Sequence, residues 1–181
     1  MRRIDTRLDG PVVIEGLVHG DSRGFFTETY RQDALVELGI DETFVQDNHS
    51  RSSLGVLRGL HYQVGQAKLV RCVRGSILDV FVDLRRGSPT FGQWESVELT
   101  DQNARQVYVP NGFAHGFCVT SEVADVVYKV STYYDPTAEA GIAYDDPALG
   151  IAWPELELSV SERDANAPVL AAVRDGLPFN Y

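Results

Sequence analysis

The strongest constraint on the fold is a succession of short segments rich in β-branched and aromatic residues, each bounded by Gly, Pro, Asn or Asp. Residues 68–85 read as one strand, a turn at 74–76 and a second strand in which apolar residues sit among Asp79 and Asp83. Further segments of this kind span 93–100, 105–110, 115–121 and 125–134. This spacing predicts an all-β sandwich or barrel of antiparallel strands.

Helical spacing is rare along the chain. Residues 31–38 have a helical pattern that ends at Gly39, a favoured C-terminal cap, and a second short helix is expected near 165–174. The Pro-, Gly-, Ala- and Asp-rich block 135–162 reads as irregular chain that crosses the end of the sheet. Because no repeat, linker or low-complexity tract divides the chain, we expect a single domain over residues 1–181.

Composition excludes several classes of partner. The formal net charge is −10 and no run of Lys or Arg occurs, which argues against nucleic acid and anionic membranes. No segment has the apolar length of a membrane span or signal peptide, so a cytoplasmic protein is expected. Cys72 and Cys118 lie in apolar runs without metal-ligand spacing and are expected to be buried thiols. A few arginines can still bind a diphosphate.

The histidines are the first candidates for chemistry. His115 ends a Pro-x-Gly-x-x-His pattern that many cupin barrels use as their second motif. Metal-binding cupins have a His-x-His first motif, whereas here His61 is followed by Tyr62 and Gln63. Since Zn, Fe and Mn sites need three or four N, O or S ligands, the pattern predicts a cupin barrel without a metal. For each histidine taken alone, a hydrogen-bonded core role is the better explanation.

Longer motifs make the chain similar to the dTDP-4-dehydrorhamnose 3,5-epimerase family over nearly its whole length. They are DSRGFFTETY at 21–30, FVQDNHSRSSLGVLRGLHYQ at 44–63, the stretch 67–94, VYVPNGFAHGF at 107–117, VYKVSTYYDP at 127–136 and SERDANAP at 161–168. The resemblance implies a homodimeric jelly-roll barrel, or double-stranded β-helix, with a few short peripheral helices. It also implies an N-terminal dimerisation arm, a C-terminal helical or irregular tail, and action on dTDP-4-keto-6-deoxyhexoses without a cofactor.

The implied reaction needs a base and a means of stabilising an enolate. A proton next to a ketone has a pKa of roughly 19 against about 6.5 for histidine, so its transfer is uphill by about 17 kcal/mol. By resemblance, His61 is the base and Lys68 faces the developing charge on the C4 oxygen. Tyr128 would protonate the carbon from the opposite face, and Asp164 would orient His61. Without the resemblance, Tyr128 reads equally well as a core tyrosine. For Lys68 the alternative is a solvated strand end, and the adjacent His61 motif favours a functional role.

The resemblance also implies a set of residues that bind the nucleotide or the sugar. Arginine suits a diphosphate because its planar fork donates two hydrogen bonds to one anion. Tyr134 matches a ring that stacks on thymine, and the segment with Arg23 and Glu28 matches the arm that pairs with a second subunit. Arg23 also precedes an aromatic pair expected to be buried. The full set is Arg23, Glu28, Gln46, Asn48, Arg58, His115, Tyr134, Glu139 and Arg163.

The chain departs from the family pattern at two places, and the motifs leave the exact function open. The loop 64–67 is shorter than in most members, and Arg163 stands where many have lysine. The same base, lysine and tyrosine would serve a single-centre epimerase acting at C3 or C5 in secondary-metabolite deoxysugar pathways, so the sequence does not separate the reactions. A non-catalytic nucleotide-sugar binder or a metal-free ketoisomerase on the same barrel is also compatible with these residues.

Overall fold

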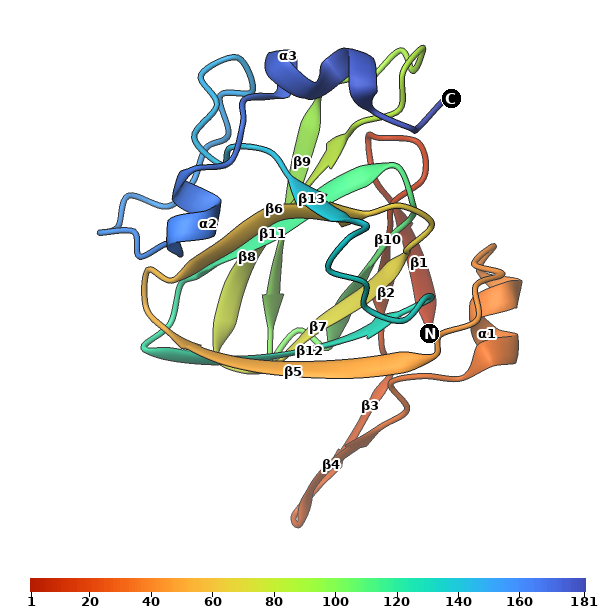
Figure 1. Cartoon of the computed structure of the whole chain (residues 1–181). Coiled ribbons are helices and arrows are strands. Elements are labelled where there is room, and N and C mark those ends of the chain that lie inside the picture. Colours follow the sequence, from red (N-terminus) through yellow and green to blue (C-terminus); the bar gives the residue numbers. More distant parts are fainter.

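Two antiparallel sheets face each other and close into a barrel in the computed structural model, which describes residues 1–181 (Figure 1). The predicted all-β jelly-roll class is thereby confirmed. In order, the six-stranded sheet contains β1 (Arg2–Asp5), β2 (Val12–Glu15), β10 (Arg105–Val109), β7 (Lys68–Arg74), β12 (Val123–Val130) and β5 (Gln46–Ser53). The five-stranded sheet contains β13 (Glu139–Gly141), β6 (Leu57–Gln63), β11 (Phe113–Val119), β8 (Ser76–Asp83) and β9 (Trp94–Thr100).

The predicted turn at 74–76 is confirmed, and it takes the chain from one sheet to the other. Strand β7 ends at Arg74 and β8 begins at Ser76. Gly75 between them has φ +75°, and a Cβ there would lie 2.2 Å from the carbonyl oxygen of Val123. Only glycine therefore fits this crossing.

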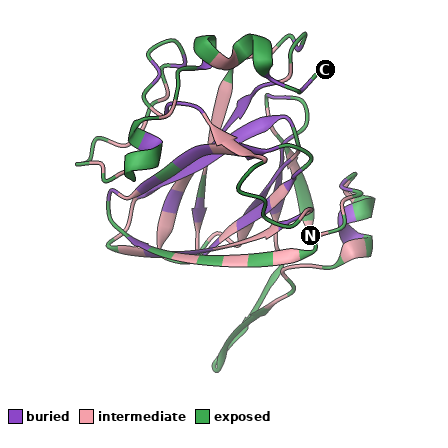
Figure 2. Cartoon of the chain, in the orientation of Figure 1, coloured by how far each residue is buried: buried purple, intermediate pink, exposed green.

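Because successive side chains along a strand point to opposite faces of the sheet, one apolar core lies inside the barrel and another lies outside it. Ile77 and Phe81 of β8 join the interior cluster, whereas Val80 and Val82 join a cluster under the C-terminal segment with Phe179. Both faces of β8 are thus covered, which explains why its sequence is an almost continuous apolar run. Figure 2 shows that most buried residues, in purple, lie on the strands of the barrel.

The predicted N-terminal helix is confirmed as α1 (Gln32–Glu37). Its Leu35 is fully buried and belongs to a cluster with Ile14 and Leu69 on the outer face of the six-stranded sheet. Gly39, with φ +85°, ends the helix and donates its N–H to the carbonyl of Val36 at 2.9 Å.

The C-terminal helix expected near 165–174 is correct only in part. The structure has two short helices, α2 (Glu162–Ala165) and α3 (Leu170–Val173), and α3 leads into the 3-10 turn Arg174–Gly176. The chain between the helices contains Pro168, which disfavours the helical conformation of the residue before it. None of the helices has the length and hydropathy of a membrane span.

The block 135–162 is mostly irregular, as expected, except that β13 adds to the edge of β6. Cys72 and Cys118 are buried free thiols, which confirms that prediction. The hairpin of β3 (Val18–Asp21) and β4 (Gly24–Thr27) projects away from the barrel and is exposed along its length (Figures 1 and 2).

The backbones of the paired strands β6 and β11 approach closely at Gly116, which yields a prediction about stability. A Cβ on Gly116 would lie 2.7 Å from the carbonyl oxygen of Arg58 and 2.9 Å from the Cα of Gly59, and neither backbone atom can move without displacing the strand. Gly116→Ala should therefore lower the free energy of unfolding by about 3 kcal/mol, measured by denaturant unfolding. Gly176→Ala, where a Cβ meets nothing within 4 Å, is the matched control. Equal stability of the two variants would contradict the close packing.

Candidate active site

A cavity of about 720 Å³ lies in the barrel interior, and most of the predicted site residues line it. Strand alternation explains this grouping, because six strands, β5, β6, β7, β11, β12 and β13, each direct side chains to the inner face of the barrel. From the predicted set, the cavity is lined by His61, Lys68, Tyr128, Asp164, Gln46, Asn48, Arg58, His115, Tyr134, Glu139 and Arg163.

His61 and Asp164 form a short hydrogen bond at the cavity wall. The Nε2 atom of His61 lies 2.6 Å from Oδ1 of Asp164, which is itself buried. The other carboxylate oxygen accepts the backbone N–H of Gly59 at 3.2 Å, and Ser161 caps α2 by accepting the N–H of Asp164. A carboxylate so held favours the tautomer with a proton on Nε2. The Nδ1 lone pair of His61 is then available as a base.

Lys68 starts β7 and reaches across the cavity to the opposite sheet. Its Nζ donates to the carbonyl oxygen of His61 at 3.4 Å. Burial lowers the pKa of Lys68 to about 8, although the nearby carboxylates of Glu139 and Asp79 oppose this shift. The ammonium is still the dominant form at pH 7, in a place where a cation interacts strongly with any negative charge beside it.

Tyr128 faces His61 from the other wall. It lies on β12 of the six-stranded sheet, whereas His61 lies on β6 of the five-stranded sheet. Burial raises the pKa of the Tyr128 phenol, and Glu139 raises it further, so the phenol keeps its proton at neutral pH. The site thus has an imidazole that can accept a proton on one wall and a phenol that can donate one on the other.

Three predicted residues form a hydrogen-bonded group at the cavity. The Oη of Tyr134 donates to Oε2 of Glu139 at 3.1 Å, and Nη1 of Arg163 donates to the same oxygen at 2.7 Å. Gln46 accepts the backbone N–H of Tyr134 at 3.0 Å. Half of the Arg163 side chain remains exposed, so its guanidinium can bind an anion that arrives from solvent.

Gln63, at the position where cupin metal ligands often lie, has a structural role. Its amide nitrogen donates to the carbonyl of Tyr133 at 2.9 Å, and its oxygen accepts the N–H of Asp135 at 2.9 Å. These bonds fix the segment that carries Tyr134. No group of three or more His, Cys, Asp or Glu side chains is arranged to hold a metal ion.

The short loop 64–67 forms a tight, anchored turn next to the site. Gly65 donates its N–H to the side chain of Asn111 at 2.7 Å, and Ala67 donates to the hydroxyl of Ser131 at 2.8 Å. Gln66 from this loop lines the cavity, although the sequence did not single it out. The loop therefore contributes to the wall even though it is short.

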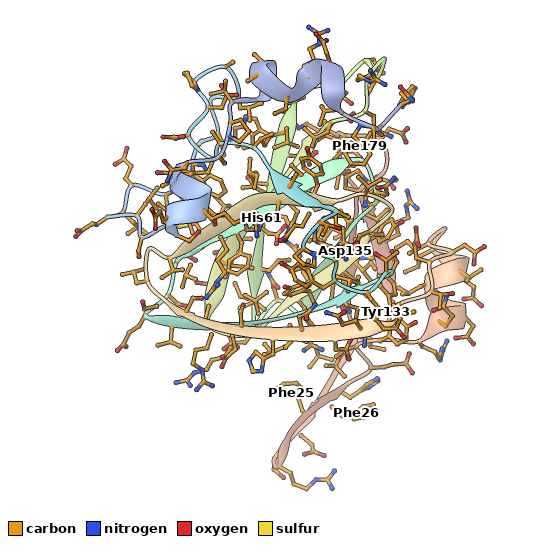
Figure 3. The ribbon with its side chains drawn as sticks, in the orientation of Figure 1. Phe25, Phe26, His61, Tyr133, Asp135 and Phe179 are labelled. Carbon is orange, nitrogen blue, oxygen red and sulfur yellow. The ribbon has the colours of Figure 1, made fainter.

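Arg23 and Glu28 are the predicted residues that one chain does not bring to the cavity. Arg23 lies at the tip of the β3–β4 hairpin and pairs with Asp21. Oε1 of Glu28 lies 3.6 Å from Nη1 of Arg31. The aromatic pair expected to be buried is exposed, with Phe25 and Phe26 at 69% and 70%. Figure 3 shows both rings on the projecting hairpin, far from His61. At its base the hairpin borders the barrel, where Val18 and Phe25 line a shallow pocket with Arg71 and Arg105.

Asp79 is the main site residue that the sequence did not predict. It is fully buried on β8, and its Oδ2 lies 2.8 Å from Nε2 of His115. It is embedded in the apolar run of β8, where the sequence pattern indicates only a strand. Its inward position, shared with Ile77 and Phe81, was the available signal.

Comparisons with known proteins give a consistent result. The model of the dTDP-4-dehydrorhamnose 3,5-epimerase family matches residues 5–172. A dTDP-4-dehydrorhamnose 3,5-epimerase from Pseudomonas aeruginosa is 52% identical over 172 residues, which cover 92% of this chain and 95% of that protein.

Solved structures show the same likeness. A dTDP-6-deoxy-D-glucose-3,5-epimerase from Legionella pneumophila, in complex with dTDP-4-keto-L-rhamnose, matches with TM-score 0.96 and 48% identity over 99% of this chain and 98% of that one. A 4-keto-6-deoxy sugar epimerase from the novobiocin biosynthetic gene cluster of Streptomyces spheroides matches with TM-score 0.96 and 42% identity over 100% and 94% of the two chains.

The burial of Lys68 predicts a gain in stability when its charge is removed. Its folded-state pKa of about 8 lies below the ordinary 10.5, so burial penalises folding fully below pH 8 and the penalty disappears as the pH rises to 10.5. Lys68→Met should therefore be more stable than the wild type by roughly 1–3 kcal/mol at pH 7. Denaturant unfolding between pH 6 and about pH 10 measures the difference, which should shrink at the alkaline end.

Lys129→Met is the matched control, because Lys129 pairs with the exposed Asp47 outside the cavity. Its pH dependence of stability should follow the wild type over this range. If the free energy of unfolding of Lys68→Met also equals that of the wild type at every pH, the ammonium of Lys68 is not desolvated.

Proposed function

The chain belongs to the dTDP-4-dehydrorhamnose 3,5-epimerase family, and from that premise we propose that it inverts C3 and C5 of dTDP-4-keto-6-deoxy-D-glucose to give dTDP-4-keto-L-rhamnose. The observation that carries the proposal is the placement of a histidine base and a phenolic acid on opposite walls of one cavity, with a buried ammonium reaching between the sheets. The enzyme is an isomerase and, by this mechanism, needs no cofactor.

The first step is removal of a proton from the carbon next to the ketone. His61 Nδ1 takes this proton, the C–H electron pair moves into an enolate, and negative charge develops on the C4 oxygen. Lys68 stabilises that oxygen because its desolvated ammonium is already in place before the charge forms. Asp164 keeps His61 in the required tautomer and stabilises the imidazolium that results.

The second step inverts the centre. Tyr128 gives its phenolic proton to the carbon from the opposite face, and the enolate returns to a ketone. His61 then holds one extra proton and Tyr128 lacks one, so both must exchange with solvent before the next centre reacts. Hydrogen from solvent therefore enters each inverted carbon.

The remaining cavity residues would bind the nucleotide and the sugar. Arg58 and Arg163 supply cations for the diphosphate, and Tyr134 supplies a ring for thymine. Gln46 and Asn48, which hydrogen-bond to each other, and His115 and Glu139 supply polar groups toward the sugar. Buried free thiols at Cys72 and Cys118 fit a reducing, cytoplasmic location.

A single-centre epimerase is the second candidate. The 42% identity to the epimerase from the novobiocin gene cluster supports it, whereas the 3,5-epimerases from Legionella pneumophila and Pseudomonas aeruginosa are 48% and 52% identical. The number of labelled carbons separates the two reactions directly.

Incubation with the substrate in heavy water tests the reaction and both residues. The wild type should place deuterium at C3 and C5, detected by NMR. His61→Ala should reduce exchange by about 10³-fold or more because the group that takes the proton is removed. Tyr128→Phe should keep exchange at a carbon next to the ketone but lose inversion by about 10²-fold, because His61 can only return its proton to the original face.

Each competing function has its own signature in the same experiment. Deuterium at one carbon would establish the single-centre reaction, and a 3-keto product would establish a ketoisomerase. A wild type that binds the nucleotide sugar but exchanges no sugar proton would reduce the protein to a binder.

We further propose a homodimer in which the β3–β4 hairpin of each subunit enters the other's site. The exposed apolar side chains of Leu17, Val18, Phe25 and Phe26 give this hairpin a surface suited to a second copy. Such pairing would bring Arg23 and Glu28 to the cavity that their own chain keeps them away from.

Subunit complementation tests this dimer. Arg23→Ala and His61→Ala should each be nearly inactive alone. In mixed dimers one site contains both changes and the other contains neither, so mixing should restore activity to roughly a quarter of the wild-type level.

The hairpin surface provides a second test of the same dimer. The double variant Phe25→Ser, Phe26→Ser should sediment as a monomer. Leu54→Ser, another exposed apolar side chain in the β5–β6 turn, is the matched control and should stay dimeric. No recovery on mixing, together with a monomeric wild type, would remove the proposal.

A further inference from the structure

A second histidine–carboxylate pair lies beside the first one. His115 on β11 is nearly buried, and its Nε2 lies 2.8 Å from Oδ2 of Asp79 on β8. Asp79 stands opposite Phe117 in the ladder of β8 and β11, so its carboxylate reaches diagonally along the interior face to His115. Its position therefore depends on two neighbouring strands and not on a loop.

The two histidines are direct neighbours across a ladder. His115 is the register partner of His61 in the pairing of β11 with β6. Side chains at opposite positions of an antiparallel pair lie on the same face of the sheet, here the face that forms the cavity wall. Because each histidine uses Nε2 for its carboxylate, each has Nδ1 left for the cavity.

The carboxylates of Asp164 and Asp79 differ in the number of hydrogen bonds that they accept. Asp164 uses both oxygens, one for His61 and one for the N–H of Gly59. Asp79 uses only Oδ2, and its Oδ1 has no hydrogen-bond partner although it is fully buried. A buried carboxylate with a free oxygen needs a nearby cation to remain charged.

Two cationic groups, His115 and Lys68, lie close enough to Asp79 to stabilise its charged form. His115 and the ammonium of Lys68 both act against the rise in pKa that burial imposes on Asp79. Other ionisable groups also line the cavity. They are His61 and Arg58 from β6, Tyr128 from β12, Glu139 from β13, Arg163 and Asp164 from α2, and Tyr134. Only His115 is in hydrogen-bond contact with Asp79.

We propose that Asp79 is a positioning residue that holds His115 as an imidazolium, so that His115 and Lys68 together form the cationic wall facing the enolate oxygen. This inference rests on the proposed epimerase function. His115 donates a hydrogen bond from Nδ1 and keeps its proton throughout, whereas its neighbour His61 gains and loses one. The opposite protonation states of the two histidines follow from their different carboxylates.

Nitrogen-15 NMR of histidine-labelled free enzyme tests the protonation state directly. The two ring nitrogens of His115 should show the imidazolium pattern at pH 7.5 in the wild type, with His115→Gln used to assign the signal. In Asp79→Asn, which keeps a hydrogen-bond acceptor but removes the charge, His115 should become neutral at this pH. A neutral His115 in the wild type would overturn the proposal, and this spectrum decides it even if Asp79→Asn does not fold.

Kinetics then test whether Asp79 acts through His115. Asp79→Asn should lower kcat by about 10- to 100-fold while the Kd for dTDP changes less than about threefold. The reason is that the positive charge on His115 stabilises the enolate oxygen and does not contact the diphosphate. In the His115→Gln background the same change should have almost no further effect on kcat. An undiminished effect in that background, or weaker dTDP binding with unchanged kcat, would contradict the proposal.

The chain provides a matched control and a way to separate the two claims. His49 and Asp125 form another His–Asp contact, at 3.2 Å, outside the cavity, and Asp125→Asn should leave kcat unchanged. A wild type that exchanges no sugar protons would sink the proposed function. An active wild type with a neutral His115 would sink only the inference about Asp79.

Discussion

Side chains alternate between the two faces of every strand, and in this barrel that alternation determines both the core and the site. The inward positions of β8 and β11 supply Phe81, Phe113 and Phe117 to the apolar cluster, and the same faces supply Asp79 and His115. A register slip of one residue would turn these groups to the outer face. Stability of the core and assembly of the site therefore depend on one register.

The site combines charges that would be unfavourable if each were buried alone. Lys68 is desolvated but lies near Glu139 and Asp79, and each inward histidine has its own carboxylate. The protein thus retains groups that lower stability, at the place where a carbon acid needs a base, an acid and a cation. The cavity provides a low-dielectric setting in which these groups act strongly on one another.

Much of the fold follows from pattern alone, because strand alternation, the Gly75 turn and the Gly39 cap are local features. The break between α2 and α3 was missed although Pro168 marks it. For the site, motifs brought together His61, Lys68 and Tyr128, and Asp164 although it lies 103 residues beyond His61. Asp79 escaped notice because one carboxylate in an apolar strand has no pattern of its own. Arg23 and Glu28 pair within their own hairpin segment, away from the cavity, and only the family resemblance assigns them to the site.

The central claim is that base and acid act on opposite faces of one sugar carbon. A crystal structure of the protein with dTDP-4-keto-L-rhamnose bound tests it most directly. We predict C3 or C5 between His61 Nδ1 and Tyr128 Oη, each about 3–3.5 Å away on opposite faces of the ring, with the C4 oxygen toward Lys68. A sugar ring with both groups on the same face, or bound away from His61, would contradict it.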